Sequence, residues 1–592
     1  MFRLIIFAVD VRAAVRYDLT MASIVKKIIR GKPYFYAREC KRIDGKPKII
    51  WQKYLGRADD IVAAVSRSDS ASAGIGQPAE AVVTEFGAVA ALLDLARRLQ
   101  LVEHIDRHVP KDGHGPSVGS YLLVSVLNRC LAPTSKAAIG DWFQKTALRR
   151  LLDVRAGQLT SQRFWDNMDR VSPQAIEAIE RDLTSHLVRE FNVDLRRVLF
   201  DATNFFTFID TFNERSSLAQ RGKSKEGRKS LRIVGLALLV SADFHIPLLH
   251  RTYPGNQTDS PTFASLTTEL VDRYHQIMQG AEHVTIVFDK GNNSADNLHA
   301  VADSPYHFIG SLVPTQHTDL LQIPAAHLRS LQDDDLPEVS CFRTRKKVFG
   351  AERTVLVTYN ENLFIAQSQT LLREIAKRQT RLRELQAQLR RRRQGKVTGG
   401  KAPTVASVHK KIDAWLKARH MKDLFQIAVA EQRGLPVLTW RFDKAAWERL
   451  QTTLLGKTLL FTDNDDWSDG DIVRGYRAQH HVETAFRCMK DPLHIALRPQ
   501  FHWTDQKIQV HVFCCVLALT LCSLLQRVTH DSGLGGSIRD LLAELSDIRE
   551  VGVLFPAKDG RSKPTIRTTL SAMQQRQRAL YDALDLQRYL AA

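Results

Sequence analysis

The chain has 592 residues, a formal net charge of +20 and a sequence pI near 9.7. This length is too great for one hydrophobic core, so three or more structural units are expected. The positive charge favours encounters with polyanions and contacts to phosphate groups, although ribosome association or simple solubility would give the same balance. The seven cysteines show no CxxC pair and no zinc-ligand spacing, which indicates reduced thiols of a cytosolic protein.

Two apolar segments bear on targeting and membranes. The first, residues 4–9, is interrupted at once by Asp10 and Arg12 and is too short for a secretory signal, and Met21 is an alternative start of translation. The second runs from Val510 to Leu525 and falls short of the roughly 20 residues that a membrane span needs. We therefore expect a core helix there and no membrane partner.

The first predicted unit covers residues 21–65. Short apolar and basic stretches alternate around the turn pair Asp44-Gly45, which predicts a basic β-hairpin from Tyr34 to Ile50. Its cations either bind the DNA backbone or solvate one face of the sheet. Residues 66–80 are rich in Ser, Ala and Gly and predict a linker.

Residues 83–190 form the second predicted unit and have helical periodicity. The short helices are separated by Pro133 and by a turn at residues 154–158. This pattern suits a helical DNA-binding domain of the helix-turn-helix type, and it suits an ordinary helical bundle about equally well.

Residues 191–313 have the clearest order of elements. We predict a strand at 198–201, a hairpin at 233–240 and 246–250, a helix from Ser260 to about Met278, a strand at 284–289, a helix at 294–301 and a strand at 307–313. This is the order of an RNase H-like sheet, in which the first and fourth strands are neighbours. The predicted fold is therefore α/β, and the topology should bring Asp201 and Asp289 together.

Residues 314–467 break this order and predict an insertion. Residues 341–359 and 424–442 are strand-rich, and between them lies a highly charged helix at about 371–393 that ends in Arg390-Arg391-Arg392-Arg393. The basic tip is either a solvated face or a projection that contacts DNA. Residues 468–530 complete the RNase H-like domain, and residues 531–592 form a C-terminal region with two helices and a segment, 551–567, of no clear type.

Three acidic residues lie where catalytic metal ions are held. Asp201 and Asp289 each end an apolar, strand-like run, so that their side chains are exposed at the edge of the sheet. Glu483 lies in a helical stretch at 470–490. Three converging carboxylates would bind hard cations and suit phosphoryl chemistry. Each acid also has an ordinary alternative role: Asp201 as a cap, Asp289 as a turn former, and Glu483 as a surface residue paired with Arg487.

The helix at 470–490 carries further polar residues. Offsets of three, four and seven place Tyr476, Gln479, Glu483 and Lys490 on one face of it. The neighbouring pair at 480 and 481 is His-His, which is typical of transition-metal sites, but no third ligand lies at suitable spacing. We expect these histidines to pack or to contact DNA.

Three motifs resemble the signature of DDE transposases of bacterial insertion sequences: Phe200-Asp201-Ala202-Thr203, Phe288-Asp289-Lys290-Gly291, and Tyr476 with Glu483 and Lys490. The most similar group has an RNase H-like domain interrupted by a β-rich insertion before the glutamate. Tyr253-Pro254-Gly255-Asn256 with Asp259, and Arg498-Pro499 with His502, support the resemblance, which covers about residues 21–550.

The resemblance implies roles for individual residues. Asp201, Asp289 and Glu483 would be catalytic and bind two Mg²⁺ ions, for which Mn²⁺ can substitute, so that hydrolysis and strand transfer share one site. Tyr476 and Lys490 would contact phosphates of the element end. Lys290 keeps a positive charge beside Asp289. Where the family often has an arginine this chain has Gln479, so either Arg477 or Arg487 supplies the charge-assisted phosphate contact or this chain lacks it.

The resemblance also implies partners and location. The partners would be double-stranded DNA, as terminal inverted repeats and as target, and a second copy of the chain, because two ends are processed together. The protein would lie in the bacterial cytoplasm with the nucleoid. Two other functions remain open: a DNA nuclease on the same fold without strand transfer, and a catalytically silent DNA-binding derivative.

Overall fold

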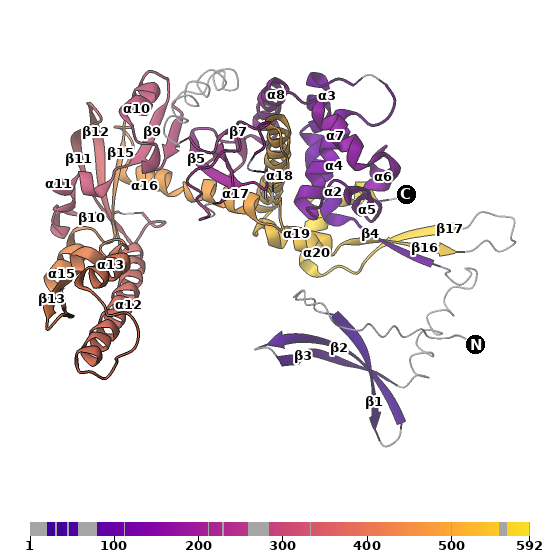
Figure 1. Ribbon diagram of the computed structural model, residues 1–592. Helices are drawn as coiled ribbons and strands as arrows, with labels where there is room; N and C mark the ends of the chain where they lie inside the picture. The colour runs from indigo at the N-terminus through magenta and orange to yellow at the C-terminus, as the bar shows by residue number, and fades with distance from the viewer. Residues whose placement is uncertain are drawn as a thin grey trace. The chain divides into compact units, whose positions relative to one another are not determined.

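The computed structural model describes residues 21–29, 32–43, 46–56, 80–111, 113–210, 212–227, 230–257, 283–331, 333–498, 500–555 and 565–590 (Figure 1). The predicted linker up to residue 79, the hairpin turn at 44–45, Asp259 and the helix expected from Ser260 lie outside these residues. The chain divides into two compact units, residues 1–82 with 551–569 and residues 83–550 with 570–592.

The first unit contains a three-stranded antiparallel sheet in the order β1-β2-β3, formed by β1 (Met21–Ile29), β2 (Lys32–Ile43) and β3 (Lys46–Gly56). The predicted hairpin is the pair β2 and β3, with Ile43 opposite Lys46. Strand β1, which was not predicted, pairs along β2. A second three-stranded sheet has the order β17-β16-β4, from β4 (Glu80–Glu85), β16 (Arg549–Phe555) and β17 (Thr565–Leu570). The unassigned segment 551–567 therefore contains strands.

A nine-stranded mixed sheet is the centre of the second unit. Five of its strands run in the order β7-β6-β5-β8-β9: β5 (Arg197–Phe206), β6 (Ile233–Ser241), β7 (Pro247–Pro254), β8 (Thr285–Phe288) and β9 (His307–Ser311). Strands β5, β8 and β9 are parallel, and β6 and β7 are antiparallel to their neighbours. This is the RNase H-like order, and it confirms the predicted mixed α/β fold.

The insertion enlarges this sheet. Strand β15 (Lys457–Thr462) pairs antiparallel with β9 and is followed outward by β12 (Ala351–Asn360), β11 (Val339–Val348) and β10 (Arg329–Ser330). The first and last parts of the predicted insertion therefore share the hydrophobic core of the RNase H-like strands.

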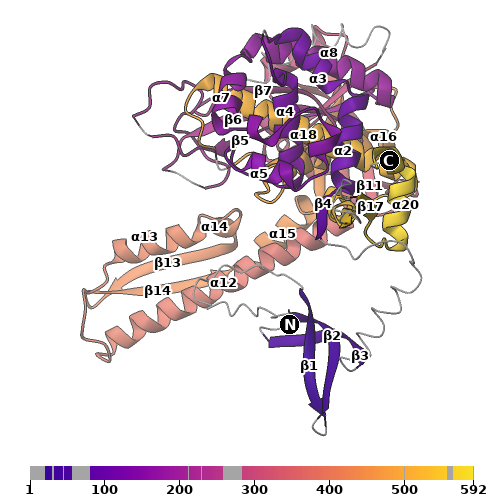
Figure 2. The same ribbon diagram turned by 90° about the vertical axis from the view of Figure 1, so that its right-hand side faces the viewer.

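The middle of the insertion has its own small core. It contains α12 (Glu361–Arg393), α13 (Val405–Leu416), α14 (Met421–Leu424), the hairpin β13 (Phe425–Gln432) and β14 (Leu435–Phe442), and α15 (Lys444–Thr453). Figure 2 shows the long helix α12 alongside this hairpin. Helix α12 begins ten residues earlier than we predicted, because the Asn360 side chain caps it by accepting from the Leu363 amide at 2.7 Å.

The helices before the sheet pack on one long core helix. Helix α18 (Asp505–Asp531) contacts α2 (Gly87–Arg98), α4 (Val118–Leu131) and strand β7 (Figure 1). Other helices of the described residues are α3 (Leu101–His108), α5 (Ile139–Gln144), α6 (Leu148–Leu151), α7 (Ser161–Asp169), α8 (Pro173–Phe191), α10 (Ala295–Ala302), α11 (Thr318–Leu321), α19 (Ile538–Ser546) and α20 (Gln575–Ala583). The helices of residues 83–190 are therefore part of the core around α18.

Helix α18 is longer than the apolar run, residues 510–525, from which we predicted it. It has 27 residues, not the 16 of the apolar run alone, because Thr504 caps its start by accepting from the Lys507 amide. Its length and its mean hydropathy of 2.2 over 18 residues would allow it to cross a membrane, and it alone passes that test among the described residues. Since 94% of that window is buried inside the protein, α18 is a core helix.

Candidate active site

The register of two parallel strands sets the positions of two acids. The ladder between β5 and β8 ends at Phe200 opposite Phe288. Asp201 and Asp289 are the next residues, so the two carboxylates occupy adjacent positions where this ladder ends. Asp289 follows the last residue of β8. Asp201 does not end its strand, contrary to our prediction, because β5 continues to Phe206 in its pairing with β6.

Two lysine ammonium groups bind the backbone of β5 just beyond Asp201. Lys225 donates to the Ala202 carbonyl, and Lys490 donates to the Asn204 carbonyl at 2.9 Å. Two positive charges therefore lie within three residues of Asp201 along the strand. Positive charges at these positions attract phosphate.

Lys490 also fixes the helix that carries Glu483. Its ammonium donates to the Thr203 hydroxyl at 2.7 Å and lies 3.5 Å from a Glu226 carboxylate oxygen. Burial lowers the pKa of Lys490, and the Glu226 charge opposes that shift. Residues 201 and 203 point to the same face of the strand. Helix α17 (His480–Lys490) therefore packs on the face of β5 that carries Asp201, and it brings Glu483 to this face.

Tyr476 lies close to both the strand acid and the helix acid. The Tyr476 hydroxyl donates to Ser311 Oγ at 2.8 Å. The Ser311 hydroxyl in turn lies 3.5 Å from Asp289 Oδ1. Burial raises the pKa of Tyr476 to about 12, and the charges of Asp289 and Glu483 add to this rise. Since both carboxylates act on the same phenol, Tyr476 marks the place where α17 and the sheet edge approach each other.

The predicted single helix at 470–490 is wrong. The structure has α16 (Asp469–Arg477) and α17, joined by a tight turn in which the Gln479 amide bonds the Tyr476 carbonyl at 3.1 Å. Helix α16 packs against β9 and β15 whereas α17 packs against β5, and the turn lets each follow its own strands. Tyr476 and Glu483 therefore do not share one helix face, and Gln479 is buried.

The other predicted DNA-binding cations have different environments. Arg477 pairs with Glu338 at 2.8 Å, whereas Arg487 is exposed and donates to the Thr484 hydroxyl at 3.0 Å. Lys290 is exposed beside Asp289. Lys290, Ser311 and Tyr476 also line a hollow of about 720 Å³ whose other wall is formed by α12 and α14 of the insertion. The acidic edge therefore opens toward the insertion.

The residues fit a divalent cation by donor type. Carboxylate oxygens are the ligands that hard divalent ions prefer. In the present arrangement, however, no group of three or more His, Cys, Asp or Glu side chains within the described ranges is close enough to hold a metal ion. Asp201 and Asp289 lie at one edge of the sheet, but the described acids do not form a metal-binding group in this arrangement.

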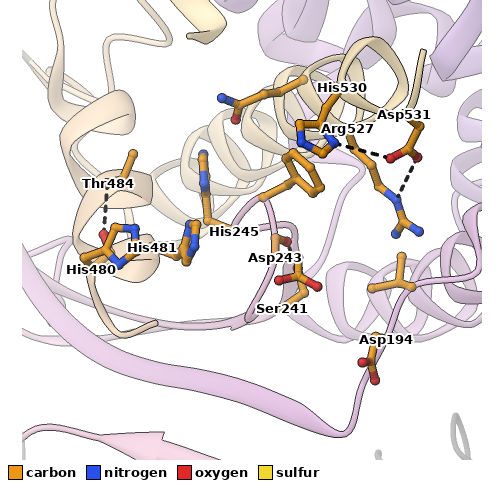
Figure 3. A pocket seen from close by; sticks show the side chains of 13 residues that line it. Asp194, Ser241, Asp243, His245, His480, His481, Thr484, Arg527, His530 and Asp531 are labelled. Atoms are coloured by element: carbon orange, nitrogen blue, oxygen red, sulfur yellow. Dashed lines mark hydrogen bonds and ion pairs between the residues drawn. The ribbon is translucent and has the colours of Figure 1, made fainter. Parts of the chain in front are cut away.

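A second hollow, of about 610 Å³, lies beside α17 (Figure 3). It brings together the histidine pair and His245, which comes from the β6–β7 turn and stacks on His481 with ring centroids 6.1 Å apart. Burial lowers the pKa of His245 to about 3 and that of His481 to about 4, so both rings are neutral at pH 7. A third histidine is therefore present. Within the described part of the chain, these side chains do not form a metal site as they stand.

Several residues of the site were missed in the sequence. Ser311 and Thr203 link the acids to α16 and α17, and Lys225 and Glu226 flank Lys490. Thr203 belongs to the motif Phe200-Asp201-Ala202-Thr203, whereas Ser311, Lys225 and Glu226 belong to no motif with its own spacing. The predicted strands at 198–201 and 307–313 indicated the neighbourhood of Thr203 and Ser311, and the basic loop from Arg221 to Lys229 contains Lys225 and Glu226.

The fold and the site together define an RNase H-like α/β protein with two strand aspartates and one helix glutamate at the sheet edge. The family model of the transposase DDE domain matches residues 194–521, more than half of the chain, and the chain belongs to this family. The chain is also similar to the solved piggyBac transposase synaptic complex with hairpin DNA, with 8% identity and a TM-score of 0.33 over 79% of this chain and 82% of that chain. A search of curated proteins found no match.

Proposed function

We propose that this protein is the transposase of a bacterial insertion sequence. It binds the terminal inverted repeats of its element, cuts the 3′ ends and joins them to target double-stranded DNA. The observation that carries the proposal is the register of Asp201 and Asp289 beneath the helix of Glu483, in a chain of the transposase DDE family. It acts as a homodimer, associated with the nucleoid in the cytoplasm.

Asp201, Asp289 and Glu483 would hold two Mg²⁺ ions, or Mn²⁺ in their place. When bound, such ions activate water or a DNA 3′-hydroxyl and stabilise the leaving oxygen. The protein side chains do the rest. The Tyr476 phenol, with its pKa of about 12, stays protonated at neutral pH and is a hydrogen-bond donor beside the acids. Lys225 and Lys490 supply positive charge next to Asp201.

The insertion supplies a large share of the DNA-binding charge. Residues 361–453 hold 20 Lys and Arg against 8 Asp and Glu, a net charge of +12 out of +20 for the whole chain. Helix α12 and the loop that follows it carry much of this excess. Charge of this density suits contacts to the phosphate backbone, which depend on position but not on base sequence.

The test is cleavage of a labelled duplex that carries the sequence flanking the gene, with Mg²⁺. Wild type is compared with Asp289→Asn, which keeps the shape of the side chain, and with Asp296→Asn, a matched change at an exposed aspartate on α10. Nicking at the element end that is lost only in Asp289→Asn supports the proposal. Cutting without regard to the end sequence indicates the nuclease, and binding that is equal in EDTA with no product indicates the silent derivative.

A further inference from the structure

Two loops beyond β5 expose four large aromatic side chains. Phe208 and Phe212 follow the strand, and Phe501 and Trp503 precede α18; their exposed fractions are 47%, 89%, 67% and 56%. We call these four residues the aromatic platform. Apolar rings gathered on a surface mark a place where something binds.

The platform is assembled from both loops. The Phe208 and Phe501 rings stack with centroids 5.3 Å apart and planes at 19°. The Phe208 amide donates to the Gln500 carbonyl at 2.8 Å, and Asn213 donates to the Trp503 carbonyl at 3.1 Å. The loops therefore form one surface, although almost 300 positions separate them in the chain.

Asp505 holds the first loop in place. Its carboxylate accepts from the Ser216 hydroxyl at 2.6 Å, from the Ser217 amide at 2.9 Å and from the Leu218 amide at 3.1 Å. Burial alone would raise the pKa of Asp505, but these bonds hold it below the usual value. Asp505, at the start of α18, thereby fixes residues 216–218 of the first loop beside the second loop.

Two arginines lie beside these rings, and one of them, Arg498, also pairs with Glu226 at 2.6 Å. The Arg215 guanidinium lies 5.8 Å from the Trp503 ring centroid, and the Arg498 guanidinium lies 5.4 Å from that of Phe206, whose ring also contacts Phe208. Rings beside arginines are the combination that binds unpaired nucleic acid, because bases stack on the rings while the cations meet phosphates. The net charge of +20 on the whole chain favours a polyanion over a second copy of the same chain.

The platform continues from the strand of the active site. Strand β5 carries Asp201 and leads to Phe206, and Phe208 follows two residues later. Seven residues of extended chain span roughly 20 Å, which is about the length of a few nucleotides of DNA. We propose that the aromatic platform stacks on unpaired nucleobases of the DNA strand held at Asp201, and this inference rests on the proposed function.

The test uses the full-length protein and three probes followed by fluorescence anisotropy. These are a blunt 20-base-pair duplex, the same duplex with a four-thymidine 3′ overhang, and a 20-mer of thymidine. The variants are Phe501→Ala and Trp503→Ala, with Phe501→Tyr and Trp503→Phe retaining a ring. Leu493→Ala is a matched control at another exposed apolar residue, which has 70% exposure.

Wild type should bind the overhang and the single strand more tightly than the blunt duplex. In each alanine variant the preference for the overhang and the single strand over the blunt duplex should fall about tenfold, while the affinity for the blunt duplex stays the same. The ring-retaining variants and Leu493→Ala should behave as wild type.

Three results would overturn the inference. One is wild type binding all three probes equally well, and another is alanine variants that weaken blunt-duplex binding as much as overhang binding. The third is a change in oligomeric mass by light scattering with unchanged DNA affinity, which makes the platform an interface between copies. If wild type binds no probe at all, the proposed function fails as well, so the two failures are distinguishable.

Discussion

The ammonium group of Lys490 lies 2.7 Å from the hydroxyl of Thr203, and this hydrogen bond joins helix α17 to strand β5. The helix carries Glu483 and the strand carries Asp201. Seven residues separate Glu483 from Lys490, about 10 Å along a helix. The position of the third acid therefore depends on a half-buried cation at the end of the same helix.

Replacing Lys490 should reduce DNA cleavage more than it reduces stability. Lys490→Met keeps the length of the side chain but removes its hydrogen bonds to Thr203 and Asn204 and its charge beside Glu226. We expect about 1–3 kcal/mol loss of unfolding free energy, because acceptors are left unpaired. We expect cleavage to fall at least tenfold, since Glu483 is less well positioned. Urea unfolding and single-turnover nicking measure the two effects.

Thr203→Val provides the control for that contact. It removes one hydroxyl and keeps the charge of Lys490, so its effects should be smaller, and the double variant should be less than additive with Lys490→Met. Additive effects on stability would show that the Lys490–Thr203 bond does not couple the helix to the strand.

Tyr476→Phe should impair cleavage while leaving the fold nearly intact. It removes the donor to Ser311 and leaves the ring in place, so the stability loss should be about 1 kcal/mol or less. Cleavage should fall about tenfold, because Ser311 next to Asp289 loses its partner. With the pKa near 12, the wild-type rate should show no ionisation of this phenol below about pH 10. Tyr359→Phe on β12 is the matched control, and equal rates in both variants would remove Tyr476 from the site.

The pairing of Asp201 with Asp289 was predictable because strand order determines register. Once the sequence indicates strands at 198–201 and 284–289, the RNase H-like order makes them parallel neighbours, and the positions after them must be adjacent. The end of β5 was not predictable in the same way. Its extension to Phe206 depends on β6, more than 25 residues later in the chain.

The break at Gln479 and the extent of the insertion also depend on distant parts of the chain. A period of 3.6 residues runs through both α16 and α17, so the pattern alone predicts one helix. The two helices separate because they pack on different strands. Likewise, nothing local shows that β15 pairs with β9, or that a turn histidine, His245, stacks on His481.

His245 should make the fold less stable in acid. Its pKa is lowered to about 3 mainly by burial and further by electrostatic interaction with His481, His480 and Arg487, whereas it is near 6.5 in the unfolded chain. The unfolded state therefore binds more protons between pH 6.5 and 3, and stability falls as the pH drops through that range. The loss from this group should be about 2 kcal/mol at pH 5.

His245→Phe is the variant that tests this effect, because it keeps a ring of similar size. Within the described residues neither ring nitrogen of His245 has a hydrogen-bond partner, so the exchange leaves no donor or acceptor unpaired. The urea midpoint of the variant should change less between pH 7 and pH 5 than that of wild type. Parallel pH curves for the two proteins would assign the acid sensitivity to other groups.

The end of helix α12 should contribute to DNA binding through phosphate contacts alone. Arg390 and Arg391 are exposed, whereas Arg392 donates to the Gly399 carbonyl at 3.1 Å and Arg393 donates to Gln432 at 3.2 Å. The double change Arg390→Gln with Arg391→Gln should therefore weaken binding to any duplex without altering the helix. If both arginines meet phosphates, the slope of log affinity against log salt should fall by about 2.

A second pair of exposed arginines provides the comparison for that slope. Arg539→Gln with Arg549→Gln removes the same charge from α19 and β16 and should leave the slope within about 0.5 of wild type. Equal reductions of the slope in both double variants would mean that binding depends on the net charge of the chain and not on the position of the arginines. An unchanged slope in the α12 variant would show that the tip of the helix is a solvated face, the alternative that its sequence left open.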